Sequence, residues 1–302
     1  MLFRNLTLFR FPPTLDLSQV DELLPTAILK DVGPLDMSSR GFIAPFGDAE
    51  SEALLHRQGQ FLWLTVGGQD RMLPPTVVND SLAKKVAEYT QKEGRRPGGK
   101  TRKAMKEELV HDLLPKAFVK SSRIDVILDQ QHGVAFVNTS SRKKAEDAMS
   151  QIRGMLGSFP ALPLNAELAP RTVLTGWIGS TPMPDSLSIG EEAELRDPIE
   201  GGAVVKCQHQ ELQGDEIDNH LQAGKVVVKL AVVAHGTVSL VLGDDLVMRK
   251  VKFLDGATDA LDSADGEGAR AEFDAIFALQ SAELQRLFLV LESSFKLSNA
   301  EA

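Results

Sequence analysis

The sequence predicts an α+β protein in which antiparallel sheets pack against helices. Two strand-like runs at 123–128 and 134–138 are followed directly by a helical run. That order favours an antiparallel α+β layer over a parallel doubly wound sheet. Residues 203–253 are again rich in strands, and glycine turns separate the last three of them. A pair of long, highly charged helical runs occupies 77–114.

The amino-terminal part combines strands with one helix. Residues 2–10 alternate apolar and polar side chains, as an edge or half-exposed strand does. The segment 48–57 places its apolar side chains at helical spacing behind Asp48, a residue type that favours the N-cap. Residues 61–66 read as a strand, which the glycine pair at 67–68 is expected to end in a turn.

Two amphipathic helices follow the proline pair at 74–75. The first helix covers 77–93, with an N-cap candidate at Asp80 or Ser81. The sequence GRRPGG at 94–99 breaks the helical period. A second helix covers 101–114, and the next residue, a proline, stops it. The two helices therefore predict a projecting helical hairpin whose tip is basic and contains glycine.

The remaining chain alternates strands with two further helices. A helix is predicted at 142–156, capped by Ser140 or Ser141 and closed by Gly157. Residues 255–270 read as an acidic loop, and 271–295 as a closing helix. The strands expected in the carboxyl-terminal part are 203–205, 226–233, 238–242 and 246–253.

Proline-rich connections at 158–164 and 179–186 are the best candidates for domain boundaries. We expect three parts: a central α+β domain from 1–75 and 124–170, a basic helical tip at 76–123, and a base α+β domain at 171–302.

Bulk composition excludes several classes of protein. With 43% hydrophobic and 25% charged residues, the composition is that of an ordinary soluble globular protein. No apolar run approaches the roughly 20 residues that span a bilayer, and the amino terminus lacks the cleavage site of a signal peptide. A single cysteine, Cys207, fits a reducing cytoplasm and, with only six histidines, argues against a structural zinc site. Aromatic residues are too few for broad base-stacking platforms.

The most informative feature is a local reversal of charge. Residues 84–123 carry twelve cations and five acids, a net of +7, whereas the rest of the chain carries −16 and the whole chain −9. Such segregation indicates a surface directed at a polyanion. The alternative is a solvated, lysine-rich helical surface. The cations expected to contact DNA are Lys84, Lys85, Lys92, Arg95, Arg96, Lys100, Arg102, Lys103, Lys106, Lys116, Lys120 and Arg123.

These cations suit phosphate contacts more than the reading of bases. Few aromatic or amide side chains are interleaved with them, and no helix rich in Arg, Asn and Gln reads as a recognition helix. A second basic run, 142–144, begins the helix that follows the two strands. We therefore expect sequence-independent binding to DNA.

Two motifs raise the alternative of an enzyme that acts on DNA, a magnesium-dependent nuclease or a nucleotide hydrolase. Residues 94–101 fit the phosphate-loop pattern GxxxxGK[ST], but a helical segment precedes them where that loop needs a buried strand. Histidines 111, 209, 220 and 235 lie near no nucleophile arrangement. We expect no enzymatic activity, cofactor or metal. The acids that could hold magnesium are Asp244, Asp245, Asp255, Asp259, Asp262 and Asp265, although acids in turns and loops are usually just solvated.

Phe118 lies between two lysines after the helix-ending proline. If its side chain is exposed to solvent, Phe118 would dock into a partner protein. The alternative is that it packs within its own domain.

Seven segments of the chain match one known family in order and spacing: GFIAPFG at 41–47, MLPPTVV at 72–78, EELVHDLLPKAF at 107–118, KKAEDAMSQIRGMLGSFPALPL at 143–164, AELRDPIEGG at 193–202, EIDNHLQAGKVVVKLAV at 216–232 and DDLVMRKVKFLD at 244–255. They resemble RdgC, the recombination-associated proteins of bacteria. The resemblance covers nearly the whole chain.

This resemblance implies a non-enzymatic, largely sequence-independent DNA-binding protein of the cytoplasm, associated with the nucleoid. It implies a ring-shaped homodimer whose positive central hole encircles duplex DNA, and antagonism of the recombinase RecA by occupation of DNA. Single-stranded DNA is a further expected partner, and a membrane is not. Phe118 matches the family's phenylalanine at one subunit contact, and Gln210 a glutamine at the second. His209 stands where some relatives have a lysine.

Overall fold

The computed structural model of the chain describes residues 2–47, 53–179, 181–199, 202–262 and 269–298. It divides into two compact units. The larger unit contains Met1–Thr26, Ala44–Thr65 and Ile124–Ala302, and the smaller unit contains Ala27–Ile43 and Val66–Arg123. The division into three domains that the sequence suggests stays a prediction, separate from this division into two units.

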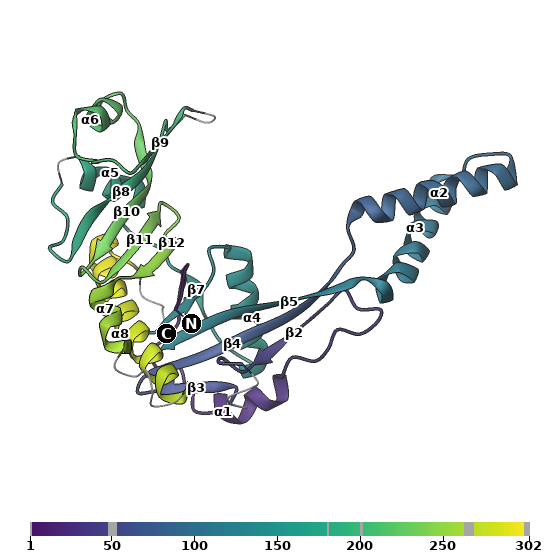
Figure 1. Cartoon of the computed structure of the whole chain (residues 1–302), viewed down its shortest axis with the longest axis horizontal. Helices are drawn as coiled ribbons and strands as arrows, with labels where there is room; N and C mark the ends of the chain where they lie inside the picture. Colours follow the sequence, from purple (N-terminus) through teal and green to yellow (C-terminus); the bar gives the residue numbers. More distant parts are fainter. Residues whose placement is uncertain (1, 48–52, 180, 200–201, 263–268, 299–302) are drawn as a thin grey trace. The chain divides into compact units, whose positions relative to one another are not determined.

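The elements within the described residues are antiparallel strands and helices, labelled in Figure 1. The strands are β1 (Thr7–Arg10), β2 (Ser38–Ile43), β3 (Leu55–Gln58), β4 (Phe61–Met72), β5 (Phe118–Asp129), β6 (Val134–Val137), β7 (Leu162–Pro163), β8 (Leu187–Arg196), β9 (Val204–Gln208), β10 (Val226–Ala234), β11 (Val238–Gly243) and β12 (Met248–Phe253). The helices are α1 (Val20–Leu23), α2 (Pro75–Glu93), α3 (Gly99–Leu113), α4 (Arg142–Leu156), α5 (Pro170–Ile178), α6 (Asp215–Gln222), α7 (Asp255–Asp262) and α8 (Ala269–Phe295), with short 3-10 turns at Leu24–Ala27 and Leu114–Lys116.

The larger unit contains a five-stranded sheet in the order β12-β11-β10-β8-β9, antiparallel throughout. Along β10, buried residues alternate with half-buried ones from Val228 onward, because successive side chains point to opposite faces of a strand. The inner face packs against α5 and α8, where Leu174, Phe277 and Phe288 are buried. The antiparallel α+β class and the strands near 204, 226, 238 and 248 are thereby confirmed.

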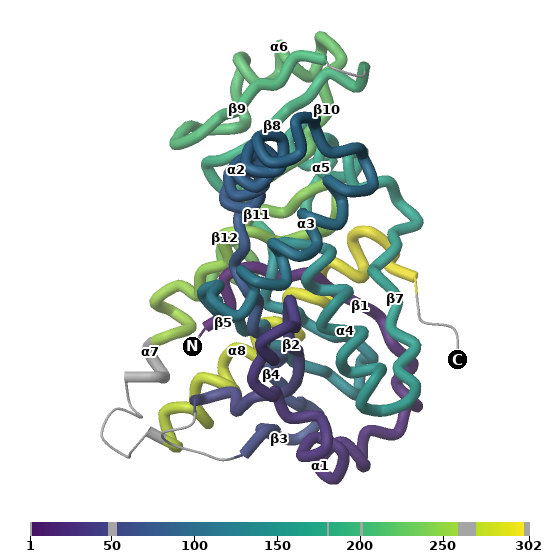
Figure 2. The backbone as a smooth tube through the Cα atoms, turned by 90° about the vertical axis from the view of Figure 1, so that its right-hand side faces the viewer, coloured from purple at the N-terminus to yellow at the C-terminus, as the bar shows by residue number. Residues whose placement is uncertain are grey.

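The part of the second sheet that lies in this unit has the order β4-β5-β6-β1-β7, with β3 paired to β4; β2 pairs with β4 in the smaller unit. The prediction that residues 2–10 form an edge or half-exposed strand is wrong. β1 lies between β6 and β7, beside β7 in Figure 2, and all four of its residues are buried. Its arginine, Arg10, is accommodated because it pairs with Glu292, donates to the His132 carbonyl at 2.7 Å and stacks over Phe288.

The smaller unit contains β2, the end of β4, the start of β5, and α2 and α3. The predicted turn at Gly67 and Gly68 is wrong, because β4 runs through both glycines. An added Cβ on Gly67 would lie 2.7 Å from Ile43 Cγ2 and 2.9 Å from Leu29 Cδ2. The glycine is therefore needed for close packing within the strand rather than for a turn.

Three other local predictions need correction. The helix at 48–57 is wrong where the structure describes it, since Leu55–Gln58 is strand β3, turned back onto β4 at Gly59 with φ +56°; residues 48–52 lie outside the described part. The loop at 255–270 begins with helix α7, whose first residue is an acid. The N-cap of α2 is Pro74, so Asp80 and Ser81 lie inside the helix.

The remaining helix predictions are confirmed. α3 ends before Pro115, and α4 begins at the predicted cap Ser141, which accepts from the Lys144 amide, and ends at Gly157. α8 begins within two residues of its predicted start and ends at Phe295. Among the described residues, no helix combines the length and apolarity that crossing a membrane would require.

Candidate nucleic-acid interface

Helices α2 and α3 lie side by side and carry most of the basic segment (Figure 1). α2 ends at Gly94, whose left-handed φ of 69° lets its amide bond the Thr90 carbonyl at 2.9 Å. Five residues, 94–98, connect it to α3. A salt bridge of 2.7 Å between Lys85 and Glu108 links the two helices.

Both helices keep their charged faces in solvent. α3 has no buried residue, and α2 buries only Val78 and Leu82. Because each helix has so few apolar residues, neither has an apolar face large enough to bury its charged side chains against the rest of the protein. The cations of this segment are therefore surface charges.

The structure places all twelve predicted DNA-binding cations in the smaller unit, and all but the half-buried Lys85 are exposed. Lys103 pairs with Glu107 at 3.8 Å on its own helix. By sequence, the smaller unit carries a net charge of +6 and the larger one −15. The reversal of charge found along the sequence is thus a difference between two compact units.

A groove of about 640 Å³ lies between α2 and the start of α3. None of its lining residues is acidic. They are Ala83, Val86, Ala87, Thr90, Gln91, Arg96, Pro97 and Arg102.

Phe118 begins β5 and is 85% exposed, so the interpretation that it packs within its own domain is wrong. Its neighbour Val119 is 44% exposed. His209 and Gln210 follow β9 in the larger unit, where His209 has a left-handed φ of 57° and lines an open groove of about 500 Å³ on the five-stranded sheet. Their predicted role in subunit contacts stays a prediction.

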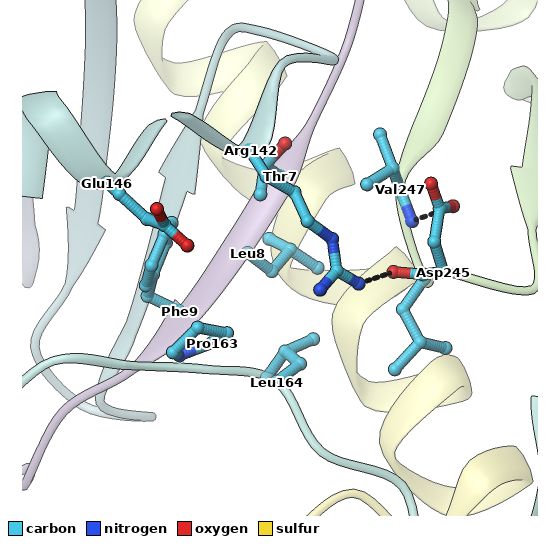
Figure 3. Close-up of a pocket in the computed structure, with 10 residues that line it drawn as sticks. Thr7, Leu8, Phe9, Arg142, Glu146, Pro163, Leu164, Asp245 and Val247 are labelled. Carbon is cyan, nitrogen blue, oxygen red and sulfur yellow. Dashed lines mark hydrogen bonds between the residues drawn. The ribbon is translucent and has the colours of Figure 1, made fainter. Parts of the chain in front are cut away.

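The basic run at 142–144 begins α4, and its first residue is engaged with another part of the larger unit. The Arg142 guanidinium donates to the Asp245 carbonyl at 2.6 Å, as Figure 3 shows. The cavity beside it, between Thr7 and Glu146, measures about 20 Å³. That volume holds about one water molecule, so it has no room for a nucleotide.

The acids proposed as metal ligands are bound by arginines instead. Asp244 accepts from Arg171 at 2.6 Å, and Asp245 accepts from Arg249 at 2.6 and 3.1 Å. Burial by itself would raise the pKa of Asp245, but the hydrogen bonds from Arg249 and from the Val247 amide lower it overall.

Asp255, Asp259 and Asp262 lie on α7, and Asp265 is outside the described residues. Within the described part of the chain, no three His, Cys, Asp or Glu side chains are grouped as metal ligands.

Of the segment 94–101 that fits the phosphate-loop pattern, residues 94–98 connect two helices and residues 99–101 form the first turn of α3. α2 precedes the segment, so the buried strand required by a nucleotide-binding loop is replaced by a polar helix. The sequence argues against a phosphate loop because it predicts a helix before residue 94, and that helix is confirmed.

Sequence reasoning missed the residue that organises the smaller unit, Arg71. Its guanidinium donates to the carbonyls of Val32, Gly33, Leu114, Pro115 and Ala117 at 3.1–3.4 Å, and its amide bonds the Met37 carbonyl. It therefore ties the loop before β2 to the turn that leads into Phe118. No sequence motif marks such a residue, because its partners are backbone carbonyls of distant segments.

A second missed group joins the β5–β6 turn to α8. His132 Nδ1 lies 2.8 Å from Asp129 Oδ2 and 3.0 Å from Gln285 Nε2. Asp129 is fully buried. The three-residue spacing of Asp129 and His132 within a turn was the available sequence signal.

Known proteins resemble the chain over its whole length. A family model described as "Putative exonuclease, RdgC" matches residues 1–298. The recombination-associated protein RdgC of Xanthomonas campestris pv. campestris (strain B100) is 68% identical over 302 residues, all of both chains. Those of Xanthomonas oryzae pv. oryzae (strain MAFF 311018) and Stenotrophomonas maltophilia (strain R551-3) are 67% and 64% identical over 301 residues, again the full length of each.

Proposed function

Because the chain belongs to the RdgC family, we propose that it is a sequence-independent DNA-binding protein whose ring-shaped homodimer encircles duplex DNA. In this role it limits recombination by RecA and acts at the nucleoid. The observation that carries the proposal is the exposed basic surface of α2 and α3 in an otherwise acidic chain.

The chemistry of this surface supports binding to the DNA backbone. Lysine and arginine side chains contact phosphates without reading bases, and neutralising phosphates releases counterions. The net −15 of the larger unit repels the same polyanion. Duplex DNA is then favoured at one surface only. Single strands carry the same phosphates and are expected to bind as well.

A homodimer is supported by an exposed aromatic side chain beside the basic surface. Phe118 exposes 85% of its area and its neighbour Val119 exposes 44%, and an aromatic anchor of this kind, once buried against a partner, is a common element of protein–protein contacts. We assign Phe118 to one subunit contact of the ring and His209 with Gln210 to the other. In this arrangement α2 and α3 form the projecting hairpin tip of each half-ring.

Opposition to RecA follows from occupancy. A protein that covers the DNA backbone without regard to sequence removes binding sites from any other protein that assembles on the same strand. The names of the relatives connect those proteins with recombination. No enzymatic step and no cofactor is required for this role.

The salt dependence of duplex binding tests the basic surface. Affinity should fall by about 0.9 log unit per phosphate contact for each log unit of salt. Replacing Arg95, Arg96, Lys100, Arg102 and Lys103 by glutamate should weaken binding to all sequences alike. A flat salt dependence, a strong preference for one sequence, or duplex binding that survives the replacement would each contradict the proposal.

Topology tests the ring. Protein bound to closed circular duplex should resist a high-salt wash and should be released once the circle is cut, because a ring can slide off a free end. Phe118→Ser should abolish this difference by opening the ring. Equal retention on circular and linear duplex would reject encirclement while leaving backbone binding intact.

The description of the family favours exonuclease activity as a second candidate function. Asp244 and Asp245 are the acids that such an enzyme would use, although both are bound by arginines. Incubation with end-labelled duplex and magnesium tests it. Cleavage that is lost in Asp245→Ala would establish the enzyme and reject the binding-only role.

A further inference from the structure

Two arginines line one groove at the junction of α2 and α3. Arg96 belongs to the connection 94–98, and Arg102 to the first turn of α3, where its amide bonds the Gly98 carbonyl at 2.9 Å. The groove measures about 640 Å³, which falls within the range of small-ligand sites. Two cations from neighbouring segments therefore share one concave surface.

The lining of this groove suits an anion that carries an apolar or sugar group. Within the described part of the chain, neither Arg96 nor Arg102 forms a salt bridge, and no acid lines the groove. A guanidinium presents a planar fork of donors that matches a phosphate in bidentate geometry. Ala83, Val86 and Ala87 supply an apolar wall on the α2 side.

Two neutral polar side chains also line the groove, those of Thr90 and Gln91, and only Gln91 has no hydrogen-bond partner on α2. The Thr90 hydroxyl already donates to the Val86 carbonyl at 2.8 Å, so its hydrogen is used within α2. The Gln91 side chain is exposed and lines the groove. A ligand thus meets two guanidiniums, one amide and an apolar wall, a combination that the scattered lysines of α3 do not provide.

We propose that this groove binds a single phosphodiester of the DNA backbone together with its sugar, with Arg96 and Arg102 holding the same phosphate. The inference rests on the proposed function and refines it. The basic surface then has one site of defined geometry within a broader field of positive charge.

A double-mutant cycle on the full-length chain tests the shared phosphate. Binding to a fluorescent duplex and to the matching single strand is measured for Arg96→Ala, Arg102→Ala and the double variant. Each single change should weaken binding about tenfold, as expected for a charge-assisted hydrogen bond. The double change should cost much less than the product of the two, because residues that share one partner are not additive.

Arg95 and Lys106 supply the matched control pair. Both are exposed cations of the same segment that do not line the groove, and their replacement by alanine removes the same charge. Their effects should be smaller and should multiply. A cycle in which both pairs multiply, with equal losses, would reject the groove and leave binding by a diffuse positive field. Failure of the unchanged protein to bind either DNA would instead reject the proposed function itself.

Charge-preserving changes and a free nucleotide complete the test. Arg96→Lys and Arg102→Lys keep the charge and lose the fork, so each should still weaken binding. Circular dichroism should show unchanged helix content in every variant. Free ATP in excess should displace little DNA; displacement that depends on Arg96 and Arg102 would identify a mononucleotide as the ligand and overturn the assignment to the backbone.

Discussion

Arg71 fixes the backbone around Phe118 through a single side chain. Its guanidinium donates to the carbonyl of Gly33 on one segment and to those of Leu114 and Ala117 on another. Arg71 lies on β4, so a side chain of β4 fixes the backbone just before Phe118, where β5 begins. Lysine could not replace it, because one ammonium cannot reach carbonyls on both sides.

We expect Arg71→Met to lower the free energy of unfolding of the smaller unit by about 1–3 kcal/mol, since several partly buried carbonyls lose their donor. Hydrogen exchange of amides in β2, α2 and β5, compared with those of β10, measures the loss locally. Arg40→Met is the control, because Arg40 forms an exposed pair with Asp70 at 2.6 Å and should cost less than about 1 kcal/mol. Equal losses from the two variants would show that Arg71 is an ordinary surface cation.

Glu194 makes a pH-dependent contribution to the five-stranded sheet. The side chain bonds Lys229 on the paired strand β10 at 2.8 Å and Arg196 at 3.0 Å. The hydrogen bond from Lys229, more than the opposing effect of burial, lowers the pKa of Glu194 below its ordinary 4.5. The folded state therefore favours the carboxylate, and its contribution is complete above that pH and is lost as the pH falls through the lower folded value.

Glu194→Gln should then reduce the free energy of unfolding by about 1 kcal/mol at neutral pH. Below pH 4.5 the difference between the two proteins should shrink towards zero, because the wild-type side chain becomes neutral as well. Urea unfolding at a series of pH values measures it. Glu211→Gln, at an exposed position, serves as the control. A difference that does not change with pH would mean that packing, not charge, sets the effect.

At the scale of elements, a helix whose start and end signals lie in its own residues could be predicted. A strand whose bounds depend on residues far away in the sequence could not. α4 has an N-cap, Ser141, and a terminating glycine, Gly157, so residues next to the helix determine where it begins and ends. β3 and α7 have weak local signals, and pairing with β4 decides the first. β4 continues through two glycines because Ile43 and Leu29, remote in sequence, need the space.

Gly67→Ala tests that reading of β4. The new methyl would lie 2.7 Å from Ile43 Cγ2, so overpacking should cost about 1–3 kcal/mol of stability. Gly154→Ala is the matched control. That glycine is in α4, where an added Cβ would meet no atom within 4 Å outside the adjoining backbone of its own helix, and alanine should stabilise the helix by up to about 1 kcal/mol. Thermal unfolding should shift in opposite directions for the two variants; a shift of the same sign would refute the packing role of Gly67.

At the scale of the whole molecule, the charge pattern was predictable and its local geometry was not. Helices with as little apolar surface as α3 must expose their cations, so sequence alone places Lys100, Lys103 and Lys106 in solvent. The groove depends on how the first turn of α3 lies against α2, which no local pattern encodes. The same holds for the ion pair of Asp244, since its partner Arg171 is far away in the sequence.

The uneven distribution of charge makes a prediction about where DNA is repelled. If the −15 of the larger unit keeps duplex away from it, then removing some of that charge should add weak, second-site binding. Replacing the exposed acids Asp147, Glu167, Asp185 and Glu211 by their amides changes that net charge to −11. Duplex binding at low salt should become tighter and its stoichiometry should rise. The gain should be largest near 0.01 M salt, where the Debye length is about 30 Å, and absent near 1 M, where it is about 3 Å. Replacing four exposed neutral residues of the same unit by alanine is the control. Unchanged stoichiometry at low salt would show that the acidic surface plays no part in directing DNA to α2 and α3.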